Sequence, residues 1–384
     1  MKNDPTPDRL RRSDPPLAGE GKKAPVVLLA AGGTAGHLFP AEALAVVLAK
    51  RGLTVDLATD RRAAHFKFPA RAVHLIPSAT LRGRNPVALA RTAALLALGT
   101  AQAWRLIGKI RPTIVVGFGG YPTVPPLLAA SLRGVPSVLH EQNGVMGRAN
   151  RLLASRVTAI ATSFPTLARL DPQLQGKITF TGNPVRPQVI AAAAIPYAAP
   201  EAGGKIRLLV FGGSQGAHVM ADIVPAAIGR MTADLRARLV VVQQARGEDL
   251  DAVRGVYARL GVTADAAAFF ADLPQRLAAA HLVISRSGAS TVAELSAIGR
   301  PAILVPLPHA LDQDQFANAG VLEAAGGAIR IEQRDFSPDR LASEIGRLAG
   351  DPEGLARMAK AAKSAGTIDA AERLADLVIK VAGG

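Results

Sequence analysis

The feature that most constrains the fold of this chain is a unit of strand, glycine loop and helix that occurs twice. The first copy runs from an apolar stretch at 24–31 (APVVLLAA) through the loop 32–37 (GGTAGH) into a helical pattern at Leu38–Lys50. The second runs from Lys205–Phe211 (KIRLLVF) through 212–217 (GGSQGA) into another helix. Because such a loop presents backbone N–H groups beside a helix N-terminus, each copy predicts a phosphate-binding turn.

The rest of the chain alternates strand-length and helix-length segments, which indicates parallel sheets covered by helices on both faces. Its 384 residues exceed the roughly 250–300 that one core can organise. The sequence therefore predicts an α/β fold of two tandem doubly wound, Rossmann-like domains that face each other across a cleft. The remaining predicted strands are Thr54–Ala58, Thr113–Gly117, Ser137–His140, Ala159–Ala161, Leu239–Gln243, Ala268–Phe270, Leu282–Ser285 and Ala302–Pro306.

The predicted boundaries follow composition. Residues 1–23 are polar and Pro-rich, without a secretory signal, and we expect a disordered extension. Residues 24–186 form the first domain and 187–366 the second, and a final helix in 367–384 can pack back on the first. The longest apolar stretch, Pro86–Gly108, is interrupted by arginines and falls short of the ~20 apolar residues of a spanning helix, which predicts a soluble or peripheral protein.

The net charge of +15 is concentrated in the first half of the chain. Residues 1–190 hold 25 Lys and Arg against 9 Asp and Glu, whereas residues 191–384 hold 20 against 21. Such an excess attracts a polyanion, either nucleic acid or an anionic membrane surface. Aromatic residues make up only 4% of the chain, which argues against nucleic acid because single-strand binding needs stacking platforms. With no cysteine, any chemistry must use oxygen and nitrogen groups.

Several polar residues follow predicted strands, at the sheet edge where ligands bind in open α/β folds. A third glycine cluster at 117–122 suits another phosphate, and 140–143 (HEQN) is either structural or functional. Neither main glycine loop has the Walker form, and neither matches Gly-x-Gly-x-x-Gly, so nicotinamide or flavin binding fits poorly. Two phosphate-binding loops facing one another would suit a phosphorylated donor and a phosphorylated acceptor.

In the second half, Glu294 is the one carboxylate in the helix start 285–294. It either binds a ribose diol or compensates the helix dipole. The spacing Asp312-x-Asp314 is found in metal-dependent sugar transferases, but no histidine ligand lies nearby and Gln315 can contact sugar hydroxyls, so we predict no metal site.

Taken in order, these motifs resemble the MurG family of bacterial cell-wall glycosyltransferases over residues 24 to about 327. The motifs are GGTAGH, GFGGYPT, HEQN followed by GRANRLLA, TGNPVRP, FGGSQGA, SRSGASTVAEL and DQDQFANA. The resemblance implies a GT-B architecture that transfers GlcNAc from UDP-GlcNAc to the muramoyl 4-hydroxyl of lipid I with inversion, forming lipid II. It also implies a peripheral protein on the cytoplasmic face of the bacterial inner membrane.

Carried over by motif, the resemblance implies that the second domain binds the donor and the first binds the acceptor. The implied donor contacts are Thr34, Ala35, Gly36, Asn143, Arg186, Ser214, Phe270, Ala289, Ser290, Thr291, Val292, Ala293, Glu294 and Gln315. The implied acceptor contacts are Gly119, Gly120, Tyr121 and His140. One departure is Ala35, where the family usually has glycine.

An inverting transfer needs a base for the acceptor hydroxyl and positive groups for the leaving diphosphate. His37 is the expected base, because it ends the first glycine loop and its ordinary pKa of about 6.5 lies near working pH, with Glu141 as the alternative. The Ser214 loop and Arg186 are expected to stabilise the diphosphate without a cofactor. Two other functions stay open: a related transferase acting on diacylglycerol, and a non-catalytic UDP-sugar-binding protein.

A basic and apolar segment between Arg61 and Arg111 has the composition of an interfacial patch. It contains no acidic residue, and leucines, isoleucines and Trp104 are interleaved with its basic side chains. The alternative is an ordinary amphipathic helix surface. The basic residues are Arg61, Arg62, Lys67, Arg71, Arg82, Arg84, Arg91, Arg105, Lys109 and Arg111.

Overall fold

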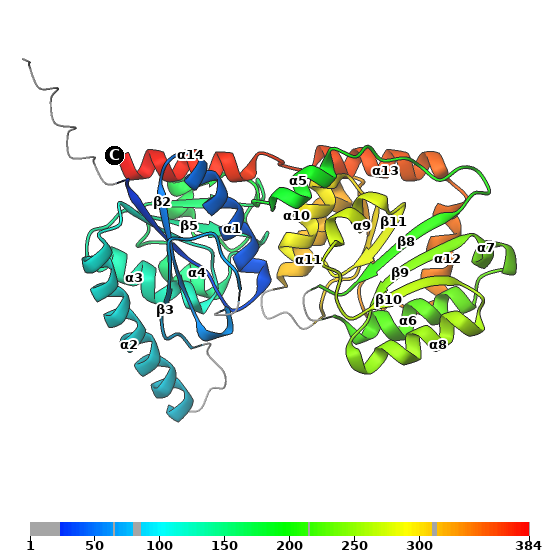
Figure 1. Cartoon of the computed structure of the whole chain (residues 1–384), viewed down its shortest axis with the longest axis horizontal. Helices are drawn as coiled ribbons and strands as arrows, with labels where there is room; N and C mark the ends of the chain where they lie inside the picture. Colours follow the sequence, from blue (N-terminus) through cyan, green and yellow to red (C-terminus); the bar gives the residue numbers. More distant parts are fainter. Residues whose placement is uncertain (1–23, 64–65, 80–85, 214–215, 309–312, 384) are drawn as a thin grey trace, which may run out of the picture.

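The computed structural model describes residues 24–63, 66–79, 86–213, 216–308 and 313–383, and Figure 1 shows them as two lobes side by side. Each lobe is built on one sheet, and every strand pair within the two sheets is parallel. The strand orders are β3-β2-β1-β4-β5-β6-β7 and β10-β9-β8-β11-β12-β13. The prediction of two tandem doubly wound α/β domains is therefore confirmed.

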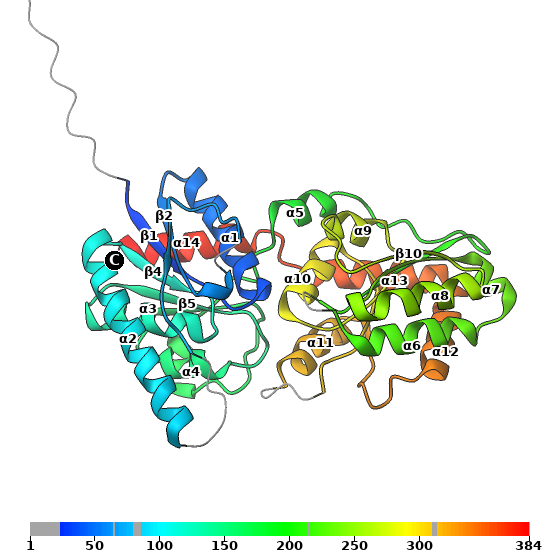
Figure 2. The same cartoon turned by 60° about the horizontal axis from the view of Figure 1, so that its bottom comes forward.

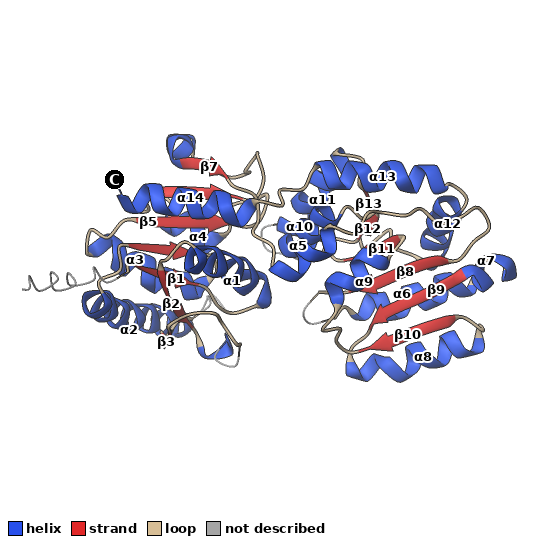
Figure 3. Ribbon diagram, turned by 45° about the horizontal axis from the view of Figure 1, so that its top comes forward, coloured by secondary structure: helices blue, strands red, loops and turns tan. Residues whose placement is uncertain are grey.

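The first sheet is buried between two layers of helices, which is why its central strands are continuous apolar runs. Helix α1 covers one face, while α2, α3 and α4 cover the other (Figure 3). The strands are β1 (Val26–Ala30), β2 (Thr54–Thr59), β3 (Ala72–Leu75), β4 (Ile114–Gly117), β5 (Ser137–Glu141), β6 (Ala159–Thr162) and β7 (Ile178–Phe180). The helices are α1 (Ala35–Lys50), α2 (Pro86–Ile110), α3 (Val124–Leu132) and α4 (Arg148–Leu153), with 3₁₀ turns η1 (Arg61–Ala63), η2 (Tyr121–Thr123) and η3 (Pro172–Lys177).

The second sheet repeats this plan, with apolar clusters on both faces. Its strands are β8 (Ile206–Phe211), β9 (Leu239–Gln244), β10 (Thr263–Ala267), β11 (Leu282–Ser285), β12 (Ala302–Leu304) and β13 (Ala328–Arg330). Its helices are α5 (Pro187–Ala193), α6 (His218–Gly229), α7 (Ala233–Arg238), α8 (Leu250–Arg259), α9 (Leu273–Ala279), α10 (Ala289–Ile298), α11 (Asp314–Ala324), α12 (Pro338–Ala349) and α13 (Pro352–Ser364), with the 3₁₀ turn η4 (Gly247–Asp249). The last helix of the chain is α14 (Ala370–Gly383). Figure 2 shows α10 and α11 on the side of this lobe that faces the first.

One predicted strand is wrong. The segment Ala268–Phe270 is a loop, and the strand precedes it as β10 at Thr263–Ala267. This edge strand pairs only with β9, and its alanines and aspartate give no apolar signal, because one side is largely exposed. Phe269 and Phe270, which suggested a strand, lie after the end of β10.

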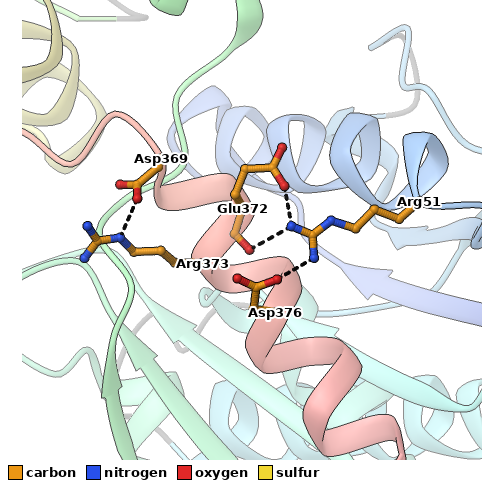
Figure 4. Close-up of polar contacts among 5 residues, drawn as sticks. All are labelled: Arg51, Asp369, Glu372, Arg373 and Asp376. Carbon is orange, nitrogen blue, oxygen red and sulfur yellow. Dashed lines mark hydrogen bonds and ion pairs between the residues drawn. The ribbon is translucent and has the colours of Figure 1, made fainter.

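The C-terminal helix α14 returns to the first lobe, where it packs on α1. Leu374 and Val378 are buried in the apolar cluster that also contains α1 side chains. Figure 4 shows Arg51, at the end of α1, paired with Glu372 and Asp376, the latter at 2.6 Å. Exposed pairs of this kind add little stability, so the buried apolar face holds the helix in place.

The chain crosses between the lobes twice, before α5 and before α14, and the two crossings touch. Gly182 has φ +82°, and a Cβ at this position would lie 2.6 Å from the Thr367 Cβ. Only glycine satisfies both the left-handed backbone and this close approach. The sequence motif around Gly182 therefore serves the junction between the lobes.

Candidate active site

Several motif residues meet where the two lobes touch. Asn318 of α11 accepts a hydrogen bond from the Gly144 amide (2.8 Å) and donates to the Asn143 side chain (3.0 Å). Ser290 of α10 donates to the Gly36 carbonyl of the first glycine loop (3.3 Å). The carboxyl-end loops of the first sheet thus lie against the starts of α10 and α11 in the second lobe.

The first glycine loop turns sharply between β1 and α1. Gly33 has φ +83°, and its amide donates to the Asp60 carboxylate (3.3 Å), which is also paired with Arg62 (2.6 Å). Exposed Thr34 is the N-cap residue, and its side chain makes no capping bond. Because α1 begins at Ala35 rather than at the predicted Leu38, Gly36 and His37 lie in its first turn.

His37 lies at the lobe interface with its imidazole held by the loop after β5. Its Nδ1 lies 2.9 Å from the Gln142 Oε1. A Cβ on Gly120, which has φ +72°, would stand 3.2 Å from its Nε2, so glycine leaves the room that this ring occupies. Burial lowers the pKa of His37 below 6.5, and the interactions with the Gln142 side chain and the Phe118 backbone oppose this shift only in part. The ring is therefore neutral near pH 7 and able to accept a proton.

The second base candidate, Glu141, is committed to the protein's own backbone and side chains. Its buried carboxylate accepts from the amides of Asn143 and Gly147 (both 3.0 Å), and from the Asn150 side chain (2.6 Å). Burial raises the pKa of Glu141, and these donors oppose that shift. The carboxylate shapes the loop after β5, and this geometry favours His37 as the base.

His140, an expected acceptor contact, is enclosed by the protein, and its role toward the acceptor stays a prediction. Its side chain is fully buried, with Nε2 3.0 Å from the Gly182 carbonyl and Nδ1 3.1 Å from the Gln142 Nε2. Burial lowers the pKa of His140 to about 4. This histidine supports the site from behind.

The third glycine cluster forms a wall beside His37. Gly119 has φ +77°, and its carbonyl accepts from the Thr123 hydroxyl (2.6 Å), which fixes the turn. Tyr121 is half-buried against the core of the first lobe. Gly120 is partly exposed beside His37, whereas Gly119 is buried and the tyrosine ring packs against the core.

Glu294 of α10 lies beside Arg186, at the N-cap of α5. The Glu294 Oε1 is 3.2 Å from the Arg186 Nη2, and the guanidinium stacks 3.8 Å from the Phe39 ring centroid. Burial raises the pKa of Glu294, and the charge of Arg186 opposes this shift. The Arg186 Nε is buried without a partner among the described residues, so a donor group remains available at this point.

The other predicted donor contacts fall into two groups. Ala289, Ser290 and Thr291 are partly exposed at the start of α10, whereas Val292 is buried in the second core and Ala293 packs against it. Spacing alone made these five residues equivalent. Of the five, Val292 is fully enclosed in the core, whereas the other four are partly exposed.

Gln315 and Phe270 are also engaged within the protein. The Gln315 Oε1 accepts from the Leu307 amide (3.1 Å), and its carbonyl accepts from the Ser287 hydroxyl (2.8 Å). The Phe270 ring is buried beneath the Arg276 guanidinium, whose Cζ is 4.2 Å from its centroid. Ser214 and Asp312 lie outside the described residues.

A metal site is not apparent in the part of the chain that the structure describes. No group of three or more His, Asp or Glu side chains gathers there in a way that could hold an ion. Asp314 accepts a hydrogen bond from the Gln315 amide (2.9 Å). Metal independence stays a prediction.

Two residues important to the geometry were missed by sequence reasoning. Gln142 was visible within HEQN but received no role, although it joins His37 to His140. Asn318, fully buried in α11, links the two lobes. A polar residue among the apolar positions of a helix was the available signal for Asn318.

Comparison with known proteins gives consistent matches over nearly the whole chain. The models of the glycosyltransferase family 28 N-terminal and C-terminal domains match residues 27–162 and 207–374. A UDP-N-acetylglucosamine–N-acetylmuramyl-(pentapeptide) pyrophosphoryl-undecaprenol N-acetylglucosamine transferase of Rhodopseudomonas palustris (strain BisB18) is 63% identical, covering 94% of this chain and 96% of that protein. A protein of the same name from Bradyrhizobium sp. (strain BTAi1 / ATCC BAA-1182) is 62% identical over 94% of this chain and 99% of its own length.

A solved structure agrees with these relatives. The crystal structure of Acinetobacter baumannii MurG has a TM-score of 0.74 with this chain at 27% identity, covering 93% of this chain and 99% of that one. The likeness therefore includes both lobes.

Proposed function

Because this chain belongs to glycosyltransferase family 28, we propose that it transfers GlcNAc from UDP-GlcNAc to the 4-hydroxyl of the MurNAc-pentapeptide in lipid I, forming lipid II with inversion at the anomeric carbon. The observation that carries this proposal is the match to named transferases at 60–63% identity over 93–94% of the chain. The geometry supports it, because His37 in the first lobe lies at the same interface as Arg186 and Glu294.

The proposed reaction is a single displacement. The acceptor 4-oxygen attacks the anomeric carbon on the face opposite to UDP, the bond from that carbon to the diphosphate oxygen breaks, and the hydroxyl proton passes to the His37 Nε2. Arg186 and the N-terminus of α6, which follows the second glycine loop, stabilise the charge that develops on the leaving diphosphate. Of the glycines expected to contact the acceptor, the partly exposed Gly120 offers its backbone, whereas Gly119 is buried and shapes the turn.

Transfer of labelled GlcNAc to a lipid I analogue, with diacylglycerol as the competing acceptor, tests this function. We expect labelled product only from the lipid I analogue. Glycosylated diacylglycerol would favour the related lipid transferase. Binding of UDP-GlcNAc without any product would favour the non-catalytic function. The neutral His37 at the lobe interface argues against that function.

We expect turnover to survive EDTA, because Arg186 and the helix N-termini can carry the charge that a divalent ion would otherwise neutralise. The measurement compares initial rates with EDTA, with EDTA followed by Mg²⁺, and without additions. Loss of turnover in EDTA and its recovery with Mg²⁺ would show that Asp314 and its neighbours hold a required ion.

We also propose that the first lobe binds an anionic membrane surface, where the lipid-linked acceptor lies. Helix α2 and strand β3 expose large apolar side chains: Val73, Leu75, Val87, Leu89, Leu98 and Trp104. Arg91, Arg105 and Lys109 of α2 are exposed beside them, and the Arg133 guanidinium lies 3.7 Å from the Trp104 ring centroid. No helix among the described residues is long and apolar enough to span a bilayer. Exposed apolar side chains together with basic side chains of the same helix suit the interface of an anionic bilayer.

The protein is expected to co-sediment with anionic vesicles, to ignore neutral ones, and to dissociate as salt rises to about 500 mM, since each basic residue contributes only ~1 kcal/mol. Charge reversal of Arg91, Arg105 and Lys109 should abolish sedimentation and preserve transfer to a short-chain acceptor. Arg82 and Arg84, which the sequence also predicts in this patch, lie outside the described residues. The matched control reverses the exposed Arg334, Arg340 and Arg357 of the second lobe. Equal sedimentation of both triple variants would refute the proposal that this surface of the first lobe binds the membrane.

A further inference from the structure

Three side chains form a continuous row behind the lobe interface. His140 Nε2 lies 3.0 Å from the Gly182 carbonyl, and its Nδ1 lies 3.1 Å from the Gln142 Nε2. The other end of the Gln142 amide, Oε1, lies 2.9 Å from the His37 Nδ1. The row therefore connects the backbone at the junction between the lobes to the proposed base.

The Gly182 carbonyl determines where the proton of His140 lies. A carbonyl can only accept, so the His140 Nε2 carries a proton and donates to it. The ring is neutral, because burial lowers the pKa of His140 to about 4. Its Nδ1 therefore has a lone pair and faces Gln142 as an acceptor.

His140 in turn determines the orientation of the Gln142 amide. The Gln142 Nε2 lies near two acceptors, the His140 Nδ1 and the His140 carbonyl at 3.2 Å. Turning the amide over would set its oxygen against both of them in a buried place, at the cost of two hydrogen bonds. The oxygen must therefore face His37, whose Nδ1 donates to it.

We propose that Gln142 is a positioning residue that holds neutral His37 in the tautomer protonated at Nδ1, so that the Nε2 lone pair is available to the acceptor hydroxyl. This inference rests on the proposed role of His37 as the base. It assigns to the amide the function that a carboxylate has in a Ser-His-Asp triad, namely control of the tautomer and of the ring orientation.

A neutral partner has a consequence that a carboxylate would not have. A buried carboxylate beside His37 would stabilise the imidazolium and raise its pKa, whereas the amide leaves the ring unprotonated near pH 7. The charged groups that act on His37 are Arg62, which lowers its pKa, and Asp314, which raises it. His140 is neutral and adds no charge there.

The direct test is the ¹⁵N NMR spectrum of the full-length protein labelled at histidine, recorded at about pH 8, with the His37 signals identified by their loss in His37→Gln. We expect a protonated-type Nδ1 and an unprotonated-type Nε2. A wild-type ring protonated at Nε2 would overturn the proposal. Because the NMR spectrum is recorded without turnover, the result is independent of whether the protein transfers GlcNAc.

Gln142→Leu removes the acceptor and should give a mixture of tautomers. We expect kcat to fall by about 10–10³-fold, with KM for UDP-GlcNAc within about twofold, because orientation and protonation of the base are disturbed but the donor site is not. The matched control is Gln243→Leu, which removes a fully buried amide from the second lobe and should leave the His37 tautomer unchanged. A single Nδ1-protonated tautomer in folded Gln142→Leu would contradict the proposal.

Gln142→Glu keeps an oxygen beside the His37 Nδ1 and adds charge. We expect the Nδ1-protonated tautomer to persist and the acid limb of the kcat–pH profile to move to higher pH, because the carboxylate raises the pKa of His37. A merely structural role for Gln142 predicts no such movement. A His37 ring protonated at Nε2 in the folded variant would count against the proposal, even if Gln142→Leu fails to fold.

Discussion

His37→Ala is expected to lower kcat by ~10²–10⁴-fold while the Kd for UDP-GlcNAc changes little. General-base assistance is typically of this size, and the variant removes the neutral ring nitrogen beside Gly120 without touching the Arg186–Glu294 pair. Single-turnover rates with a lipid I analogue measure the chemical step, and calorimetric titration with UDP-GlcNAc measures donor binding. Loss of both in equal proportion would mean that His37 holds the donor.

The pH profile gives a second measurement of the same assignment. Because burial lowers the pKa of His37, the base becomes protonated only below pH 6.5, and activity should fall on the acid side of that value. His74→Ala, a change on β3 at a histidine paired with Asp56, is the matched control and should leave the profile unchanged. If His37→Ala keeps most of its turnover, Glu141 becomes the candidate base, although its carboxylate accepts hydrogen bonds from Asn143, Gly147 and Asn150.

The sequence was informative about the fold wherever a strand is buried on both faces. The central strands β1, β4, β8 and β11 are apolar runs of four to six residues, and periodicity locates such runs well. The edge strands β3, β7 and β13 escaped prediction, because three or four half-exposed residues carry almost no pattern. Their pairing is decided by the neighbouring strand.

The candidate site was predictable to the level of the loop, but not to the level of the side chain. Spacing after a strand placed HEQN at the carboxyl edge of the first sheet, and β5 does end at Glu141. Spacing could not show that His140 is buried or that Val292 belongs to the core. Those outcomes depend on how helices and loops distant in sequence pack against the strand end, as Gly182 does against His140.

Glu294→Gln is expected to weaken UDP-GlcNAc binding by about 10–150-fold, the equivalent of the ~1.5–3 kcal/mol of a hydrogen bond to a charged group. Glu294 is buried at the lobe interface on α10, and its Oε1 is 3.2 Å from Arg186, whose charge favours the ionised carboxylate. A carboxylate in this position can accept from both ribose hydroxyls, whereas the amide keeps only one accepting oxygen. Calorimetric titration of the two proteins measures the difference.

The comparison ligand is the 2′-deoxy analogue of UDP-GlcNAc, which removes one of the two hydroxyls. If Glu294 accepts hydrogen bonds from the ribose diol, the wild type should bind UDP-GlcNAc more tightly than the 2′-deoxy analogue. Glu294→Gln should lose most of that preference. The matched control is Glu323→Gln, because Glu323 also pairs with an arginine (Arg330, 2.8 Å) that stacks on a phenylalanine (Phe316, 3.9 Å), in the same lobe. If Glu294→Gln loses equal affinity for both ligands, the carboxylate acts by holding Arg186 against Phe39, and the ribose is recognised elsewhere.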